Sequence, residues 1–384
     1  MEKVKLTDIC DFQGGSQPPK EEWSFDEQEG YIRMLQIRDF TQGERVTPEY
    51  IKISNTTKMC EANDILIARY GASIGKILTG LAGAYNVAIM RTIPDTSRIK
   101  KLYLYYYLKS PYFQNAILNV GSRAAQAGFN KEDLSKLDIE CPELIKQDKI
   151  IAVLEKLECI IEKRKIELSN LDDLIKARFV EMFGDPVSNP YGYDKVALSD
   201  LADIKIGPFG SLLHKEDYID GGHPLLNPSH IVDGKVSPDD KLTISDEKYE
   251  ELSAYQLKTG DVVMGRRGEM GRCAVVPEDG FLCGTGSMLI RTKGEVTADY
   301  IQKIISFPSF KKTIEDMAVG QTMPNLNVPI VSGFQIIKPP MEVQDRYYAF
   351  AEQVNKSKFD TMTFAPIYAI INLYLHTYFY QGRR

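Results

Sequence analysis

The chain has 384 residues, of which 43% are hydrophobic and 26% charged, as in an ordinary soluble globular protein of two or three domains. Its net charge of −6 argues against binding DNA unaided, so any nucleic-acid affinity must come from local patches or a partner. Six scattered cysteines without a Cys-x-x-Cys pair, and only four histidines, argue against a zinc site and predict reduced thiols in the cytoplasm. The sequence lacks a signal-peptide pattern and an apolar run that could span a bilayer, so we expect no membrane association.

Residues 1–142 are predicted to form the first domain, with mixed strands and helices. Short apolar runs at residues 65–68 and 87–90 are bounded by Gly, Pro, Asn and Asp, which is the pattern of strands and turns. One helix is expected at about residues 100–119, where Leu102 and three consecutive tyrosines precede Pro111.

Two loops of this domain carry residues suited to DNA. The segment RYGASIGK at residues 69–76 resembles a phosphate loop, but only three residues separate its glycines and Ile77 replaces the magnesium-binding Ser or Thr. A turn with two glycines can instead bring backbone N–H groups and flanking cations to a DNA backbone. The second loop, at residues 121–126, offers side-chain types that pair with base edges. The candidate DNA-binding residues of the two loops are Arg69, Tyr70, Ser73, Lys76, Ser122, Arg123 and Gln126.

Residues 143–184 form the second predicted segment, one long helix. Residues 143–183 contain no Pro or Gly, and their apolar residues alternate in steps of three and four, which predicts a coiled-coil seam. About forty residues make a rod of roughly 60 Å, and Gly184 followed by Pro186 ends it. The expected helix–helix or partner interface includes Leu154, Leu157, Ile161, Leu168, Leu171 and Ile175.

The first domain then returns. VKLTDI at residues 4–9 recurs as VALSDL at 196–201, and NDILIARYG at 63–71 recurs as GDVVMGRRG at 260–268. SPYF at 110–113 recurs as FPSF at 307–310, and LDIECP at 137–142 recurs as FQIIKP at 334–339. This period is too long for a solenoid repeat, so residues 185–340 are a second domain-sized copy. A protein of two like halves suits a ligand with two half-sites, of which DNA is the commonest.

The second copy repeats both loops with different side chains. If these loops read bases, the two halves read different sequences; the alternative is that they are ordinary hairpin turns and polar loops with solvated charges. The candidate DNA-binding residues of this copy are Arg266, Arg267, Arg272, Gln321, Thr322 and Asn325.

Residues 341–384 are predicted to be the counterpart of the long helix, with Val354 and Ile371 at its interface. Pro366 falls inside this segment, where we expect a kink or break. The two long helices are expected to pack together as an antiparallel pair.

Catalytic groupings are missing from the sequence. There is no carboxylate cluster with a nearby Lys for magnesium, no metal-ligand spacing among the histidines and no Ser-His-Asp set. The segment Asn189-Pro190-Tyr191 resembles part of an amino-methyltransferase motif, but it follows a helix and is interpreted as a linker turn. We therefore predict a chain that carries out no chemistry alone.

The order of these motifs resembles that of the specificity subunits of type I restriction-modification systems, the HsdS family, over nearly the whole chain. The resemblance rests on the Asp64–Gly71 and Asp261–Gly268 segments, the following loops that lead to Asn130 and Asn327, and the Gln-Asp pairs at 147–148 and 344–345. It implies an α+β fold with two tandem-duplicated target recognition domains, separated by two long helices that form an antiparallel coiled coil.

The resemblance also implies partners and a division of labour. Each domain would read one half of a bipartite double-stranded DNA target, and the helices would set the spacing and dock two methyltransferase subunits. Those subunits would bind S-adenosylmethionine and methylate adenine after flipping it, and an ATP- and magnesium-dependent endonuclease and translocase would complete the complex. This chain would hold no cofactor or metal itself. The alternatives are the specificity part of a single-chain modification and cleavage system, or a coiled-coil adaptor without a DNA role.

Overall fold

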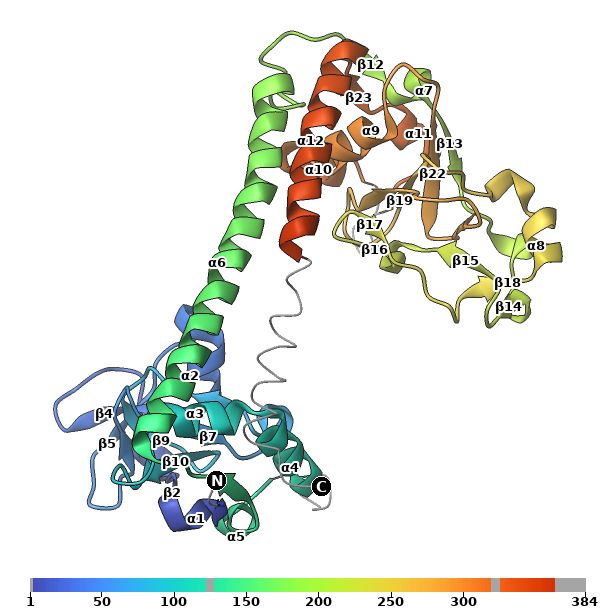
Figure 1. Cartoon of the computed structure of the whole chain (residues 1–384). Coiled ribbons are helices and arrows are strands. Elements are labelled where there is room, and N and C mark those ends of the chain that lie inside the picture. Colours follow the sequence, from blue (N-terminus) through green and yellow to red (C-terminus); the bar gives the residue numbers. More distant parts are fainter. Residues whose placement is uncertain (1–2, 122–127, 319–324, 363–384) are drawn as a thin grey trace. The chain divides into compact units, whose positions relative to one another are not determined.

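The computed structural model describes residues 3–121, 128–318 and 325–362. These residues fall into two compact units, the first running up to Glu167 and the second covering Leu168–Phe359. Each unit contains one of the two copies, and many of the elements of each are labelled in Figure 1. The α+β architecture expected from the sequence is confirmed.

The first copy is built on three sheets. Its central sheet has the strand order β2-β10-β7-β8 and is antiparallel throughout, while the five-stranded sheet β3-β5-β4-β9-β6 contains one parallel pair, β4 with β9. The third sheet pairs β1 with β11. The strands are β1 (Lys3–Lys5), β2 (Cys10–Gly14), β3 (Trp23–Ser24), β4 (Tyr31–Leu35), β5 (Tyr50–Lys52), β6 (Met59–Cys60), β7 (Leu66–Ala68), β8 (Ile77–Leu78), β9 (Gly83–Tyr85), β10 (Ile89–Pro94) and β11 (Asp138–Glu140).

The second copy repeats this plan. Its central sheet has the order β13-β22-β19-β20, its second sheet has the order β14-β18-β15-β21 with a parallel β15–β21 pair, and β12 pairs with β23. A hairpin of β16 and β17 is added. The strands are β12 (Lys195–Ala197), β13 (Ala202–Ile206), β14 (Tyr218–Ile219), β15 (His223–Leu226), β16 (Ile231–Val232), β17 (Lys235–Val236), β18 (Thr243–Ile244), β19 (Val262–Gly265), β20 (Cys273–Val275), β21 (Leu282–Cys283), β22 (Ser287–Thr292) and β23 (Gln335–Ile337).

Equivalent residues make equivalent contacts in the two copies, which confirms the duplication. Tyr103 donates its hydroxyl to the Glu140 carbonyl at 2.9 Å, and Tyr300 donates to the Ile337 carbonyl at 3.0 Å. The motif glutamines are both fully buried: the Gln147 Oε1 accepts from the Lys100 backbone N–H, and the Gln344 Oε1 accepts from that of Thr297. Each glutamine thus joins the start of a long helix to the start of a helix in its own domain.

The segment expected to be one helix over 100–119 is two helices. The first ends at Lys109 and the second begins at Pro111, because a proline fits the first position of a helix but cannot continue one. The second copy breaks in the same way, at Pro308. The short helices are α1 (Leu6–Ile9), α2 (Ile37–Gln42), α3 (Lys101–Lys109), α4 (Pro111–Gly121), α5 (Lys131–Ser135), α7 (Leu198–Leu201), α8 (Asp246–Glu251), α9 (Ala298–Ile305), α10 (Pro308–Met317) and α11 (Val328–Ser332).

The expected central helix is α6, which spans Leu144–Phe183. Gly184, with φ of 74°, follows its last residue in the left-handed conformation of a helix end. Within the described part of the C-terminal segment, α12 spans Met341–Met362; Pro366 and Ile371 lie outside the described residues. No helix in the described part of the chain is long and apolar enough to cross a membrane.

The side chains of the seam predicted along α6 are buried or half-buried. Leu154, Ile161 and Ile175 are buried, and Leu157, Leu168 and Leu171 are half-buried. Leu154 belongs to the core of the first domain, whereas Ile175 belongs to that of the second.

In the second unit, α12 packs antiparallel to the end of α6. Tyr347, near the start of α12, contacts Phe183 and Phe179, while Lys358, further along α12, pairs with Asp172, which is earlier in α6. Val354 is buried in the same core. The expected packing of the two helices is therefore confirmed over this region.

Candidate nucleic-acid interface

The Arg-x-Gly loop of each copy, residues 69–76 and 266–272, leaves the edge of the central sheet that is formed by the strand ends beside the start of β10 or β22. In the first copy β2 and β7 both end beside the start of β10, because Gly14 pairs with Met90 and Ala68 pairs with Ile89. The second copy has the same arrangement, with β13 and β19 ending beside the start of β22. Two loops therefore start from the same sheet edge in each domain, the loop after β2 or β13 and the Arg-x-Gly loop after β7 or β19.

The Arg-x-Gly loop is the turn of a β-hairpin, as its glycines predict. It joins β7 to β8 in the first copy and β19 to β20 in the second. Gly71 and Gly75 have φ of 69° and 81°, and Gly268 and Gly271 have φ of 81° and 73°. Because non-glycine residues rarely adopt these angles, the glycines determine the shape of both turns.

The first arginine of each turn is anchored to a residue at the end of the second candidate loop or just after it. The Arg69 Nε donates to the Phe129 carbonyl at 3.2 Å, and the Arg266 Nε donates to the Asn325 Oδ1 at 3.2 Å. Backbone bridges join Tyr70 to Gly128 and Arg267 to Asn325. In both copies the Arg-x-Gly turn therefore contacts the described residues next to the second candidate loop, whereas Ser122, Arg123, Gln126, Gln321 and Thr322 lie outside the described residues.

These arginines carry charge that no described acid neutralises. Among residues 3–121, 128–318 and 325–362, no carboxylate forms an ion pair with Arg69, Arg266 or Arg267. Burial and the neighbouring Arg267 lower the pKa of the Arg266 guanidinium, although an arginine remains charged. Two adjacent cations held in this way favour an anionic ligand, because an anion would relieve their mutual repulsion.

Tyr70 stands where the second copy has Arg267, and it is held differently. Its ring is so close to Gly128 that a Cβ on that glycine would come within 2.4 Å of it, and the Arg69 guanidinium lies 5.0 Å from the ring centroid. The side chain remains 39% exposed. In the first copy the Tyr70 ring thus packs against Gly128, whereas in the second copy the Asn325 side chain accepts a hydrogen bond from Arg266.

The last basic residue of the turn also differs between the copies. Lys76 is exposed, whereas the Arg272 Nη2 donates to the Glu269 Oε2 at 2.7 Å and its Nη1 donates to the Pro228 carbonyl at 3.2 Å. Hydrogen bonds from Arg272 and Lys311 lower the pKa of Glu269. Arg272 is therefore engaged within the protein, and Ser73 is half-buried.

Helices support the turns from behind. The Gln114 Nε2 of α4 donates to the Gly75 carbonyl at 2.9 Å, and the Lys311 Nζ of α10 lies 3.1 Å from the Glu269 Oε1. Gln114 and Lys311 occupy the same position, three residues after the proline that begins each helix. The turns thus rest on side chains that the sequence did not single out, although their spacing from the prolines was available.

A buried aspartate anchors the strand before each turn. The Asp64 Oδ2 accepts from the Glu61 backbone N–H at 3.0 Å, and the carboxylate forms ion pairs with Arg91 and Lys101 at 2.8 and 3.1 Å. Burial alone would raise the pKa of Asp64, but these contacts outweigh it and lower that pKa. Asp261 is held by the Lys258 backbone N–H and by Arg291.

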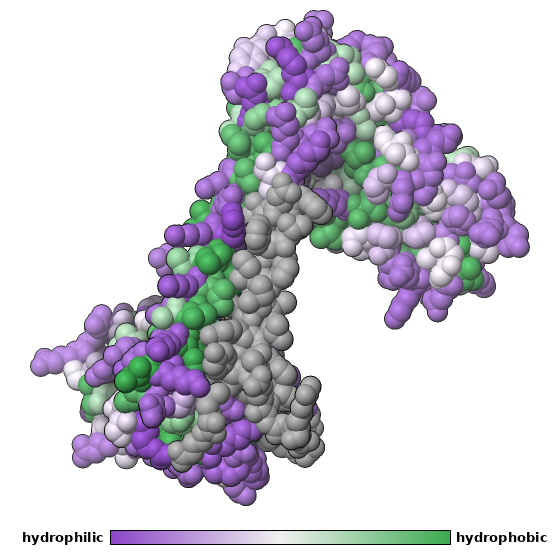
Figure 2. Space-filling model, viewed as in Figure 1, coloured by the Kyte–Doolittle hydropathy of each residue, from purple (hydrophilic) through white to green (hydrophobic). Residues whose placement is uncertain are grey.

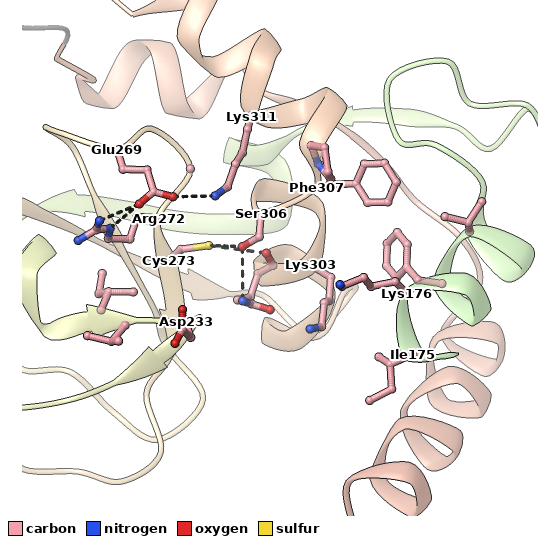
Figure 3. A pocket seen from close by; sticks show the side chains of 18 of the residues that line it. Ile175, Lys176, Asp233, Glu269, Arg272, Cys273, Lys303, Ser306, Phe307 and Lys311 are labelled. Carbon is pink, nitrogen blue, oxygen red and sulfur yellow. Dashed lines mark hydrogen bonds and ion pairs between the residues drawn. The ribbon is translucent and has the colours of Figure 1, made fainter. Parts of the chain in front are cut away.

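A cleft of about 740 Å³ adjoins the Arg-x-Gly turn of the second copy. Figure 3 shows Glu269 between Arg272 and Lys311 on one side, with Lys176 and Ile175 of α6 on the other. The Cys273 thiol in its wall lies 3.3 Å from the Ser306 hydroxyl, and burial raises the thiol's pKa to about 11. This cysteine is therefore protonated at neutral pH and is not an activated nucleophile.

Metal-binding geometry is also missing from the described residues. Within them, no group of three or more His, Cys, Asp or Glu side chains could hold a metal ion. All six cysteines are free thiols. Asn189 lies in a turn with φ of 47°, and its side chain bonds to the backbone of Tyr193, as expected for a linker.

Two like domains, each with an anchored arginine on a glycine-shaped turn, are suited to an anionic ligand with two related halves. The family model described as the type I restriction modification DNA specificity domain matches residues 1–170 and again residues 190–366. The chain therefore belongs to this family, as the sequence pattern predicted.

Individual relatives agree with this assignment. The type I restriction enzyme MjaVIII specificity subunit of Methanocaldococcus jannaschii is 20% identical over 89% of this chain and 83% of its own length. A solved structure from work on complex assembly and conformational transition of the type I restriction-modification system covers 98% of this chain and 97% of its own, with TM-score 0.66 and 18% identity. The type I S subunit from M. genitalium covers 100% and 96%, with TM-score 0.53 and 13% identity. These neighbours share the fold of this chain.

Proposed function

We propose that this chain is the DNA specificity subunit of a type I restriction-modification complex, in which each domain reads one half of a bipartite target. The observation that carries the proposal is the anchored Arg-x-Gly turn of each domain, which is joined to Gly128 and Phe129 in the first copy and to Asn325 in the second. Arg69, Arg266 and Arg267 lie there without an acidic partner among the described residues. Cations on glycine-shaped turns suit DNA phosphates, and the neighbouring loops would supply the side chains that contact bases.

The difference between the copies supports two different half-sites. Tyr70 and Gly128 of the first copy are replaced by Arg267 and Asn325 in the second, so the same scaffold presents different chemistry. In this proposal the candidate residues of the two loops remain DNA-binding, with two roles revised. Asn325 orients Arg266, and Arg272 supports the turn through Glu269.

We further propose that the long helices set the distance between half-sites and dock two methyltransferase subunits. Val153, Ile160 and Leu174 lie on one face of α6 at multiples of seven residues and are 38%, 43% and 46% exposed. Hydrophobic surface along this helix is visible in Figure 2. Glu167 occupies the heptad position between Ile160 and Leu174, and exposed apolar side chains beside a buried seam are the kind of surface that a partner helix covers.

The chemistry would belong to the partners. S-adenosylmethionine would be bound by the methyltransferase subunits, ATP and magnesium would serve the endonuclease subunits, and this chain would act in the cytoplasm without a cofactor. The named relative is a specificity subunit of a type I enzyme, which favours this assignment over a single-chain modification and cleavage system. Purification of the partners would distinguish the two, because a single-chain system has one large catalytic polypeptide.

Expression with the methyltransferase in a host without other adenine methylation tests the proposal. We expect a discontinuous methylated motif that appears only when this chain is present. Methylation that does not depend on this chain would contradict it, and would favour an adaptor without a DNA role.

A further inference from the structure

A second loop leaves the same sheet edge as the Arg-x-Gly turn, and sequence reasoning did not single it out. In the second copy it follows β13 and consists of Gly207, Pro208, Phe209 and a one-turn 3-10 helix, Gly210–Leu212. Gly207 and Pro208 are buried, but the Phe209 side chain is 61% exposed. This loop thus directs an aromatic ring into solvent beside two buried residues.

The backbone on both sides of Phe209 is constrained. A Cβ on Gly207 would lie 2.0 Å from the Gly284 carbonyl oxygen, so only glycine fits there. The Gly207 N–H donates to the Ser287 carbonyl at 3.1 Å, and Gly210 has φ of 65°. Because the backbone is held in place, the ring is presented with a small loss of conformational entropy on binding.

The loop lies next to the arginines of the proposed interface. Gly207 bonds to Ser287, and the Arg266 backbone N–H donates to the Gly286 carbonyl at 3.0 Å. The two loops therefore flank the same turn between β21 and β22, and β13 and β19 lie on either side of β22 in the central sheet (Figure 1). A DNA segment bound to Arg266 and Arg267 would pass close to Phe209.

The first copy has the same loop without the aromatic ring. Gly15 makes the equivalent close approach, with a Cβ position 2.1 Å from the Asn86 carbonyl oxygen. Two residues later the first copy has Gln17 where the second has Phe209. The Pro18 carbonyl accepts a hydrogen bond from the Trp23 Nε1 at 3.2 Å. The scaffold of the loop is thus common to both copies, and the exposed phenylalanine belongs to the second alone.

We propose that Phe209 is a stacking wedge that inserts between adjacent bases of the half-site read by the second domain. The inference rests on the proposed function, because it requires DNA at this edge. Apolar side chains that enter a base step partly unstack it and bend the duplex, at the least cost in pyrimidine–purine steps. The arginines of the neighbouring turn would hold the phosphates on either side. With Gln17 at the matching position, the first half-site would be bound without a wedge.

The test uses the assembled complex of this chain with its methyltransferase subunits, once the methylated motif is mapped. Phe209→Ala, Phe209→Trp and the control Phe25→Ala, an exposed phenylalanine outside this loop, are compared. Duplexes carry 2-aminopurine at single positions of the second half-site, away from the methylated adenine. We expect one position to fluoresce strongly with the unaltered protein and with Phe209→Trp. Phe209→Ala should lose that signal and bind the duplex about tenfold more weakly, because it removes one stacking contact.

Each other outcome overturns the wedge. If Phe209→Ala gives the same fluorescence and the same affinity for the duplex as Phe25→Ala, the ring does not stack on DNA. Weaker assembly with the methyltransferase, measured by size-exclusion chromatography without DNA, would show that Phe209 contacts a protein partner. Exchange of residues 185–340 for the corresponding domain of a relative distinguishes a failure of the wedge from a failure of the proposed function. If that exchange alters one half-site while Phe209→Ala changes nothing, only the wedge is wrong.

Discussion

At the scale of single residues, the charged groups divide into those neutralised inside the protein and those that have no acidic partner among the described residues. Asp64 is buried and surrounded by Arg91, Lys101 and a backbone N–H, whereas Arg266 is anchored through Nε alone. The sequence identified both as parts of one motif, but it could not tell them apart. Their environments depend on strands whose paired residues are 21 to 28 positions apart in the chain.

Replacement of Asp64 by Asn should destabilise the first domain by about 2 kcal/mol at pH 7, because it leaves Arg91 and Lys101 without their counter-charge. The pKa of Asp64 is lowered by folding, so its contribution is complete above the unfolded pKa of about 4. That contribution is lost as the pH falls through the folded pKa. The difference in stability between Asp64→Asn and the unaltered protein should therefore disappear at acidic pH. Hydrogen exchange of β7 and β10 measures this difference.

Asp138→Asn is the matched control, because Asp138 forms an exposed ion pair with Lys5. We expect an effect below about 1 kcal/mol at every pH. Equal destabilisation by the two variants would mean that the buried ion pairs of Asp64 do not support the strand.

Arg266 and Asn325 should act as one unit. Arg266→Lys retains the charge but loses the Nε donor, and Asn325→Ala loses the acceptor. We expect each variant to slow methylation of the target by about tenfold, and the double variant to be little slower than either one. Methylation rates measured on the mapped motif test this coupling. If the double variant is slowed by the product of the two single effects, Asn325 contacts bases independently of Arg266.

At the scale of elements, the sequence predicted regular structure better than loop structure. The heptad pattern located α6 to within one residue at its start, because forty residues without Pro or Gly leave few alternatives. The break between α3 and α4 was missed because the tyrosines before Pro111 and the apolar residues after it continue one periodic pattern. The support of the Arg-x-Gly turns by Gln114 and Lys311 could not be predicted, since it depends on the packing of a helix against a hairpin.

Insertion of four alanines after Ser169 tests α6 as a ruler. Four residues lengthen a helix by about 6 Å and rotate the part of the chain beyond the insertion by about 40° more than a full turn. We expect the methylated adenines to move apart by about two base pairs, as read from a genome-wide methylation map. An insertion of seven residues retains the heptad register of the seam, so it should change the spacing with less loss of activity.

The control is a four-residue insertion after Glu27, in the exposed segment between β3 and β4. It should leave the spacing unchanged. An unchanged spacing after the insertions in α6 as well would refute the ruler.

At the scale of the whole molecule, the duplication organises both structure and function. The repeated motifs predicted two copies, and the matched strand orders, buried glutamines and tyrosine hydrogen bonds confirm them. The copies differ where loops leave the sheet edge, at Tyr70 and Arg267 and at Gln17 and Phe209. The net charge of −6 is compatible with a DNA-binding role if the partner subunits supply much of the surface that contacts phosphates.

The central claim is that each domain reads its own half-site, and one domain exchange tests it most directly. Residues 185–340 are replaced by the corresponding domain of a relative with a different target, and modified adenines are mapped genome-wide in cells that contain the methyltransferase. We predict that one half of the methylated motif changes to that of the relative while the other half and the spacing remain. A motif that stays the same, or one that changes in both halves, would contradict this account.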